Sequence, residues 1–344
     1  MALAIGITGL AQSGKSSLFQ ALTAASQGDV GGKRLPMARA PVPDERLDRL
    51  SAIFNPKKTT PATVDFLDMP GGSGTGLGDQ ALGEIRTATA LVEVVRCFPH
   101  GYLGEPTPQK DMEDFELEIM LADLKIVEGR LERAKKLTPP EKAVLERLQP
   151  PLAAGDFTAL PQFDAEELKL LSGMGLLSLK PRIYCANLAE DLMGKNSEHE
   201  QTVRAMAARR GTQAIATSAL LESEVAQLDP EERQAFLQDL GIQETGLSQL
   251  VRASYERLGL MTFFTVGEDE CRAWTVRQHA RAPEAAGAIH SDLERGFIRA
   301  EVIGYDTFLA CGSMAAAKDQ GKLRVEGKEY EVHEGEIVHI RFNV

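Results

Sequence analysis

The sequence predicts an α/β fold that is interrupted by a helical insertion and followed by a smaller α+β domain. Short apolar runs, which are typical of buried strands, alternate with helical segments over residues 1–104 and 179–260. This alternation favours a largely parallel sheet. Residues 105–178 carry charged sequence with helical spacing, and residues 261–344 are rich in strand-like runs. The length of 344 residues agrees with two or three compact units.

The predicted sheet begins with a strand at residues 3–8, which leads through a glycine-rich turn into a helix over residues 17–25. Leu18, Ala21 and Leu22 give this helix its apolar spacing. Four further apolar runs complete the expected sheet, and they occupy residues 62–67, 90–98, 181–186 and 213–217.

The insertion at 105–178 is predicted to be an antiparallel helical arm. Apolar residues recur every three or four positions among charges, at Leu117, Leu121, Leu124, Val127 and Leu131. Two proline pairs, at 139–140 and 150–151, punctuate two further helical pieces. Because an apolar stripe must first bury itself, packing between helices is favoured over a coiled coil that binds a partner.

The sequence pattern changes at Met261 and becomes rich in strand-like runs. Five such runs surround one predicted helix at residues 283–296. The runs are MTFFTV, RAWTV, RAEVIGY, KLRVEG and KEYEVHEGEIVHIRFNV. Such a pattern over so short a stretch predicts a separate α+β domain.

Composition excludes several classes of protein. The net charge is −12, and the acidic excess is spread over all three predicted parts, which argues against binding nucleic acid through bulk positive charge. Local basic clusters, such as Arg295 with Arg299 or Lys318 with Lys322 and Arg324, stay open as contacts to RNA. The four cysteines form no CxxC pair, so a disulfide framework or zinc knuckle is not expected. We expect a cytoplasmic protein with no membrane span and no DNA partner.

The strongest local signal is Gly9-Leu-Ala-Gln-Ser-Gly14-Lys15-Ser16, which fits G-x-x-x-x-G-K-[ST] between a predicted strand and a predicted helix. Glycines let backbone N–H groups surround a phosphate, and the start of the helix adds partial positive charge. We expect this stretch to bind nucleotide, with Lys15 stabilising the charge of the β and γ phosphates and Ser16 binding Mg²⁺. The expected contacts are Gly9, Gln12, Ser13, Gly14, Lys15, Ser16 and Ser17.

Two further motifs follow predicted strands. Asp68-Met-Pro-Gly71 fits the D-x-x-G pattern, in which the aspartate holds the metal through water and the glycine N–H senses a γ-phosphate. Asn187-Leu-Ala-Glu190 stands where GTPases carry N-K-x-D, but Leu188 replaces the lysine and Glu190 the shorter aspartate that binds guanine. This change favours ATP over GTP. Asn187, Leu188 and Glu190 are nevertheless expected to be nucleotide-binding residues. Ser218 and Ala219, after the last predicted strand, are expected to contact the base through the backbone.

Taken together, the residues resemble the YchF/Obg-like ATPases of the Obg branch of translation-factor GTPases. The stretches that carry the resemblance are GLAQSGKSSLFQALT, APVPDERLDRLSAIF, EIRTATALVEVVRCF, LKPRIYCANLAED, LDPEERQAFLQDLGI, RAWTV, IHSDLERGFIRAEVIGYDTF and FNV. The resemblance implies a Ras-like phosphate-loop NTPase domain at 1–104 and 179–260, a coiled-coil arm at 105–178 and a β-grasp TGS domain at 261–344. It also implies an Mg²⁺-dependent ATPase whose arm and TGS domain face the ribosome or RNA.

Three departures from the family pattern concern hydrolysis. Gln12 stands where the family carries an asparagine linked to potassium binding. The switch I region has no threonine between Thr23 and Thr59, and Gly72 replaces a hydrophobic residue. Two hypotheses therefore stay open: a slow ATPase switch, or a nucleotide-binding adaptor with little turnover; a GTPase is a further alternative. No general base is identified, and His100, the nearest histidine, is interpreted as a surface residue.

Overall fold

The computed structural model describes residues 3–25, 35–71, 76–133, 135 and 137–343. It divides the chain into two compact units. The first comprises Met1–Ala40 and Asp65–Ser254, and the second comprises Pro41–Val64 and Tyr255–Val344. The predicted arm is part of the first unit.

The first unit is built on a six-stranded sheet in the order β2-β4-β1-β5-β6-β7. Its strands are β1 (Ala4–Thr8), β2 (Met37–Pro41), β4 (Thr63–Asp68), β5 (Ala90–Cys97), β6 (Arg182–Leu188) and β7 (Ala214–Thr217). The pairs β1–β4, β1–β5, β5–β6 and β6–β7 are parallel. Every residue of β1, β5 and β6 is buried, which explains why these strands read as continuous apolar runs. Only β2 was not expected.

The helices of this unit outside the arm are α1 (Lys15–Ala25), α3 (Asp79–Ile85), α7 (Glu198–Arg209), α8 (Ala219–Val225), α9 (Pro230–Asp239) and α10 (Gly246–Arg257), with a 3₁₀ turn η4 (Glu190–Leu192) after β6. Of these, α1 packs on β1 and on α8, and α7 packs on β5, β6 and β7. One buried cluster joins β5, β6 and α7 through Val95, Tyr184 and Val203. Another joins α3 to the strand ends through Met69 and Ile85. Both bury apolar surface that fixes the strand ends.

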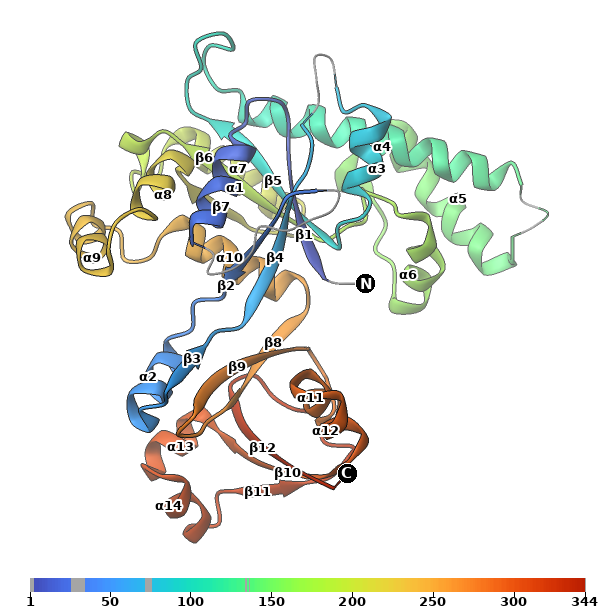
Figure 1. Ribbon diagram of the computed structural model, residues 1–344. Coiled ribbons are helices and arrows are strands. Elements are labelled where there is room, and N and C mark those ends of the chain that lie inside the picture. The colour runs from blue at the N-terminus through green and yellow to red at the C-terminus, as the bar shows by residue number, and fades with distance from the viewer. Residues whose placement is uncertain (1–2, 26–34, 72–75, 134, 136, 344) are drawn as a thin grey trace. The chain divides into compact units, whose positions relative to one another are not determined.

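The arm consists of α4 (Pro108–Leu131), α5 (Pro139–Ala154) and α6 (Ala165–Leu171), with short 3₁₀ turns η2 (Phe157–Ala159) and η3 (Ser172–Met174). Figure 1 shows α4 and α5 side by side. A capping box between Thr138 and Glu141 starts α5, and Pro150 and Pro151 lie inside that helix instead of ending it. Among the described helices, even the 24-residue α4 is not apolar enough to cross a membrane.

The buried face of α4 differs from the predicted apolar stripe. Leu117 and Leu121 are 44% and 46% exposed, whereas Phe115 and Ile119 are fully buried. The reason is that α4 packs on β5 and α7 as well as on α5. Its position against the sheet therefore sets which face is covered.

A buried ionic cluster fixes α4 to the sheet. Both carboxylate oxygens of Glu116 accept hydrogen bonds from the guanidinium of Arg210, which follows α7. The hydroxyl of Tyr184 on β6 donates to the same carboxylate at 2.7 Å. The Glu116 and Arg210 side chains are only 5% and 7% exposed, so this pair is a buried ion pair between the arm and the sheet.

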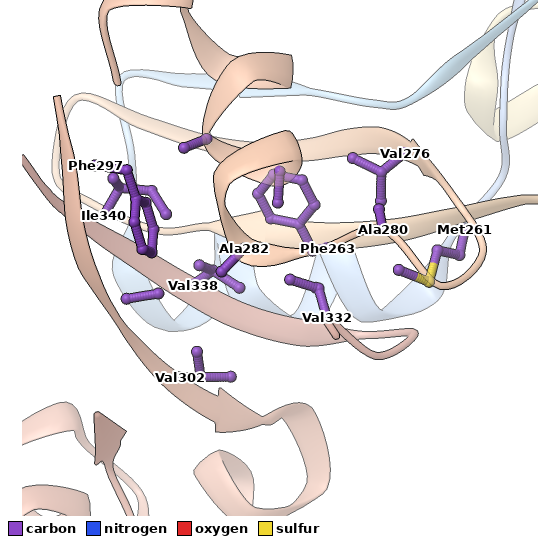
Figure 2. Close-up of a cluster of buried hydrophobic side chains, with 13 residues drawn as sticks. Met261, Phe263, Val276, Ala280, Ala282, Phe297, Val302, Val332, Val338 and Ile340 are labelled. Carbon is purple, nitrogen blue, oxygen red and sulfur yellow. The ribbon is translucent and has the colours of Figure 1, made fainter. Parts of the chain in front are cut away.

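The second unit contains the six-stranded sheet β11-β10-β12-β8-β9-β3. Its elements are α2 (Glu45–Phe54), β3 (Lys58–Thr60), β8 (Leu260–Thr265), β9 (Glu270–Arg277), α11 (Ala282–Ile289), α12 (Ser291–Arg295), β10 (Phe297–Gly304), α13 (Tyr305–Cys311), α14 (Met314–Asp319), β11 (Arg324–Glu326) and β12 (Glu336–Phe342). Figure 2 shows its core, in which Phe263, Val338 and Ala282 gather between strands and α11. The expected single helix at 283–296 is two helices, α11 and α12.

Residues 41–64 belong to this second unit, although the sequence analysis assigned them to the nucleotide domain. The physical reason is long-range pairing: β3 pairs in parallel with β9, opposite Glu270, Cys271 and Arg272. In addition, Phe54 of α2 stacks on Phe308 with a centroid separation of 5.5 Å. Neither contact leaves a local signal in the sequence.

We predict that the Glu116→Ala variant lowers the free energy of unfolding of the first unit by about 3–5 kcal/mol, because it leaves the buried Arg210 guanidinium without its carboxylate. A urea titration followed by far-UV circular dichroism measures this, since the only tryptophan, Trp274, lies in the second unit. The control is Glu113→Ala on the exposed face of α4, which should change stability by less than about 0.5 kcal/mol. Equal effects of the two variants would contradict a structural role for the ion pair.

Candidate functional site

The loop at residues 9–14 has the backbone geometry that a phosphate-binding loop requires. It joins the end of β1 to the start of α1 at Lys15. Gly9, Gln12 and Gly14 have φ angles of 136°, 60° and 92°, a region that glycine enters without steric cost. Gln12 adopts it as a non-glycine residue. These turns bring successive N–H groups and the first turn of α1 to the same side, which is an anion-binding arrangement.

Two close approaches require glycine in this loop. A Cβ at Gly14 would collide with the side-chain nitrogen of Asn187, and one at Gly9 would collide with the carbonyl oxygen of Val94 on β5. The loop is therefore packed against β5 and β6. Larger residues at these two positions would displace it.

Lys15 lies inside the loop and is only 7% exposed. Its Nζ donates a hydrogen bond to the carbonyl oxygen of Leu10 at 2.5 Å. Burial lowers the pKa of Lys15 to about 8, and the nearby Asp68 carboxylate partly opposes this. An anionic phosphate beside the ammonium group would favour its charged form.

Asp68 ends β4 next to Lys15. Its Oδ1 is buried without a hydrogen-bond partner in the described part of the chain. Burial raises the pKa of Asp68, and Lys15 partly offsets the effect. Gly71 is close as well, since a Cβ there would lie 2.9 Å from the Nζ of Lys15. The D-x-x-G motif and the phosphate loop therefore meet, as the sequence predicts.

These residues line one pocket of 430 Å³. Its lining is Ala11, Gln12, Lys15, Ser16, Leu35, Pro36, Asp68, Met69, Pro70, Gly71 and Glu84. The donor set fits Mg²⁺, because the unpaired Asp68 oxygen and the exposed Ser16 are oxygen ligands. In the described residues no three His, Cys, Asp or Glu side chains form a metal cage, and Mg²⁺ at phosphates typically uses only one or two protein ligands.

Asn187 connects the phosphate loop to the base side of the site. Its Nδ2 donates to the carbonyl oxygen of Ser13 at 3.0 Å, and its Oδ1 accepts from the N–H of Ala219 at 2.9 Å. Both polar atoms of the amide are therefore engaged within the protein. Ser218 caps α8, with its Oγ accepting from the N–H of Leu221.

Leu188 does not present its side chain to a ligand. It is 2% exposed and lies in the core cluster with Tyr184 and Ala186. Side chains alternate along β6, so Leu188 faces this core when Asn187 faces the phosphate loop. The assignment of the Leu188 side chain to the nucleotide site is thus corrected. Glu190 is exposed at the start of η4, and Ser17 is exposed on α1.

Other residues singled out in the sequence analysis do not line this pocket or are not described. Gly72 and most of the switch I region lie outside the described residues. His100 is in the loop after β5, where its Nδ1 accepts from the N–H of Tyr102 at 3.3 Å. Three residues of the 430 Å³ pocket lie outside the predicted motifs, namely Leu35, Pro36 and Glu84. The sequence analysis missed them, and Glu84 reaches the pocket because it lies on α3.

A second cavity, of 760 Å³, is lined by the phosphate loop together with β5 and α4. The loop contributes Leu10, Ala11, Gln12 and Ser13, β5 contributes residues 93–96, and α4 contributes Lys110, Asp111, Asp114, Leu117 and Glu118. No sequence motif indicates this cavity, because α4 is distant in the chain.

Comparisons with known proteins agree with this geometry. Residues 260–343 match the family model YchF-GTPase_C, described as a protein of unknown function (DUF933). The chain is 42% identical over 369 residues to the "Ribosome-binding ATPase YchF" of Bacillus subtilis and 39% identical over 367 residues to that of Escherichia coli O157:H7, with all of each protein covered.

A solved structure is similar over nearly the whole fold. The YchF GTPase of Schizosaccharomyces pombe aligns with a TM-score of 0.89 at 28% identity, covering 98% of this chain and 97% of that one. The resemblance found from the sequence motifs is confirmed by these matches. Because the identity to curated relatives extends over the full length, the chain belongs to the YchF family.

Proposed function

We propose that this protein is an Mg²⁺-dependent nucleoside triphosphatase that prefers ATP and associates with ribosomes. The observation that carries the proposal is the convergence of Lys15, Ser16, Asp68 and Gly71 on one pocket. These are the parts that P-loop hydrolases use to neutralise charge, hold metal and sense a γ-phosphate.

Each residue has a separate task in this proposal. Lys15 stabilises negative charge on the transferred phosphoryl group. Ser16 and Asp68 would hold Mg²⁺, which when bound neutralises charge between the β and γ phosphates. Gly71, next to Lys15, offers its N–H to the γ-phosphate. Asn187 positions the loop through Ser13 and does not itself react.

The Lys15→Ala variant should lower ATP turnover by at least about 100-fold, because it removes the cation at the phosphates. Phosphate release by purified protein measures this, and Lys125→Ala, an exposed lysine on α4, is the control. Equal turnover in wild type and Lys15→Ala, with labelled ATP still bound, would favour the adaptor alternative. If wild type bound no labelled ATP, both readings would be rejected.

The preference for ATP rests on the base side of the site. Leu188 is buried in the core and Glu190 is exposed, so the lysine and aspartate that select guanine in GTPases have no counterparts here. The curated relatives named above are ATPases by name, whereas the Schizosaccharomyces pombe protein is called a GTPase. The buried position of Leu188 supports the first alternative.

In a competition experiment, unlabelled ATP should displace labelled ATP at a concentration at least about tenfold lower than GTP does. The physical reason is that guanine would leave its N1 and N2 donors without the acceptor that GTPases provide. The measurement is filter binding at fixed Mg²⁺, with CTP as a control for binding through phosphates alone. A clear preference for GTP would contradict this reading.

Ribosome association is proposed from the names of the relatives and from local positive charge on the second unit. Arg299, Lys318 and Lys322 are exposed. Arg295 and Arg324 pair with carboxylates of Asp292 and of Glu326 and Glu336. Only the first group is therefore expected to contact phosphate.

The double variant Lys318→Glu/Lys322→Glu should reduce co-sedimentation with purified ribosomes. The reduction should be larger at low salt than at high salt, because contacts of lysine to phosphate release counterions and therefore contribute most to binding at low salt. Pelleting without ribosomes is the control. Binding that is independent of both salt and these two charges would exclude this surface as the contact.

A further inference from the structure

The arm holds Leu77, which follows the D-x-x-G motif in the chain. Glu118, on α4, accepts a hydrogen bond from the backbone N–H of Leu77 through Oε2 at 2.5 Å. The two residues are 41 positions apart in sequence. A hydrogen bond to an ionised carboxylate is among the stronger ones that a backbone N–H can make.

Two further contacts restrict the same place. Gly76 has a φ angle of 157°, and a Cβ on it would lie 2.6 Å from Oε1 of Glu118, so the backbone lies directly against the carboxylate. The Leu77 side chain is 8% exposed and packs in one cluster with Phe115 and Ile119 of α4. Backbone and side chain are thus both bound to the first helix of the arm.

Glu118 also lines a cavity that it shares with the phosphate loop. Gly76, Gln12 and Ser13 are among the other lining residues of this 760 Å³ cavity. Ser13 is 2% exposed, and its Oγ has no hydrogen-bond partner among the described residues. One side chain of the arm therefore contacts Leu77 and shares a cavity with the loop that surrounds phosphate.

We propose that Glu118 is a positioning residue for nucleotide hydrolysis, and that it couples the arm to the nucleotide pocket. It acts through Leu77, whose side chain packs in one buried cluster with Met69. Met69 lines the nucleotide pocket next to Asp68, so a carboxylate that holds Leu77 also holds this wall of the pocket. The proposal rests on the hydrolytic function proposed above. Because coupling between binding sites is reciprocal, a partner that binds α4 more tightly in one nucleotide state changes the affinity for nucleotide, and the nucleotide changes the affinity of α4 for that partner by the same factor.

Three variants test the positioning role. Glu118→Ala removes the acceptor, Glu118→Gln keeps an oxygen that can accept from Leu77, and Glu128→Ala changes an exposed glutamate on the same helix. We expect Glu118→Ala to lower kcat about tenfold because Leu77 and the wall of the pocket packed against it are no longer held, with KM within about twofold of wild type. Glu118→Gln and Glu128→Ala should stay near the wild-type kcat. A kcat for Glu118→Ala within about twofold of wild type would overturn the proposal.

Hydrogen exchange at the Leu77 amide separates this proposal from the hydrolytic one. In wild type, exchange at this amide should differ between protein with a non-hydrolysable ATP analogue and protein with ADP, and Glu118→Ala should abolish the difference. Glu118→Gln keeps an acceptor for the Leu77 N–H, so it should retain the difference, and this comparison with wild type can be made even if the alanine variant does not fold. If wild type turned over ATP no faster than Lys15→Ala, the proposed hydrolytic function would be wrong. Hydrogen exchange at the Leu77 amide would then be the measurement that tests the coupling between the arm and the nucleotide pocket. Leu77 exchange that is identical in both nucleotide states in wild type would then overturn the coupling.

Discussion

The site depends on one buried amide. Asn187 donates to the carbonyl oxygen of Ser13 and accepts from the N–H of Ala219, so it joins the phosphate loop to the loop after β7. The space for this bridge exists only because residue 14 is glycine. Since a buried polar group must find partners, both loops are fixed together. Lys15 and Asp68 then meet at a defined place at the strand ends.

Buried charge connects the arm to the same sheet. Glu116 faces inward to Arg210 and Tyr184, and Asp123, further along α4, accepts from the N–H and hydroxyl of Ser178 at 2.7 Å. These contacts fix the middle of α4, since breaking a buried pair is costly. They give the Glu118 contact to Leu77 a rigid base, because a side chain on a mobile helix could not hold Leu77 in place.

Burial also explains the chemistry of the pocket. Removal of water lowers the pKa of Lys15 and raises that of Asp68, and each charge partly compensates the other. Phosphate and Mg²⁺ are the ligands whose charges would favour the ionised forms of both groups. A ligand of opposite charge to each side chain is thus stabilised more strongly than it would be by exposed residues.

The sequence by itself determined the parts whose physics is local: the phosphate loop from its glycines and lysine, the strands from apolar runs, and the D-x-x-G motif from its place at a strand end. The tertiary structure decided what depends on long-range packing. The pairing of β3 with β9 moved residues 41–64 to the second unit, and the docking of α4 on the sheet exposed Leu117 and buried Glu116. It placed Leu188 in the core beside Tyr184. Glu118 lies mid-helix with no motif around it, and only folding brings it to Leu77, because a contact across 41 residues leaves no periodic signal.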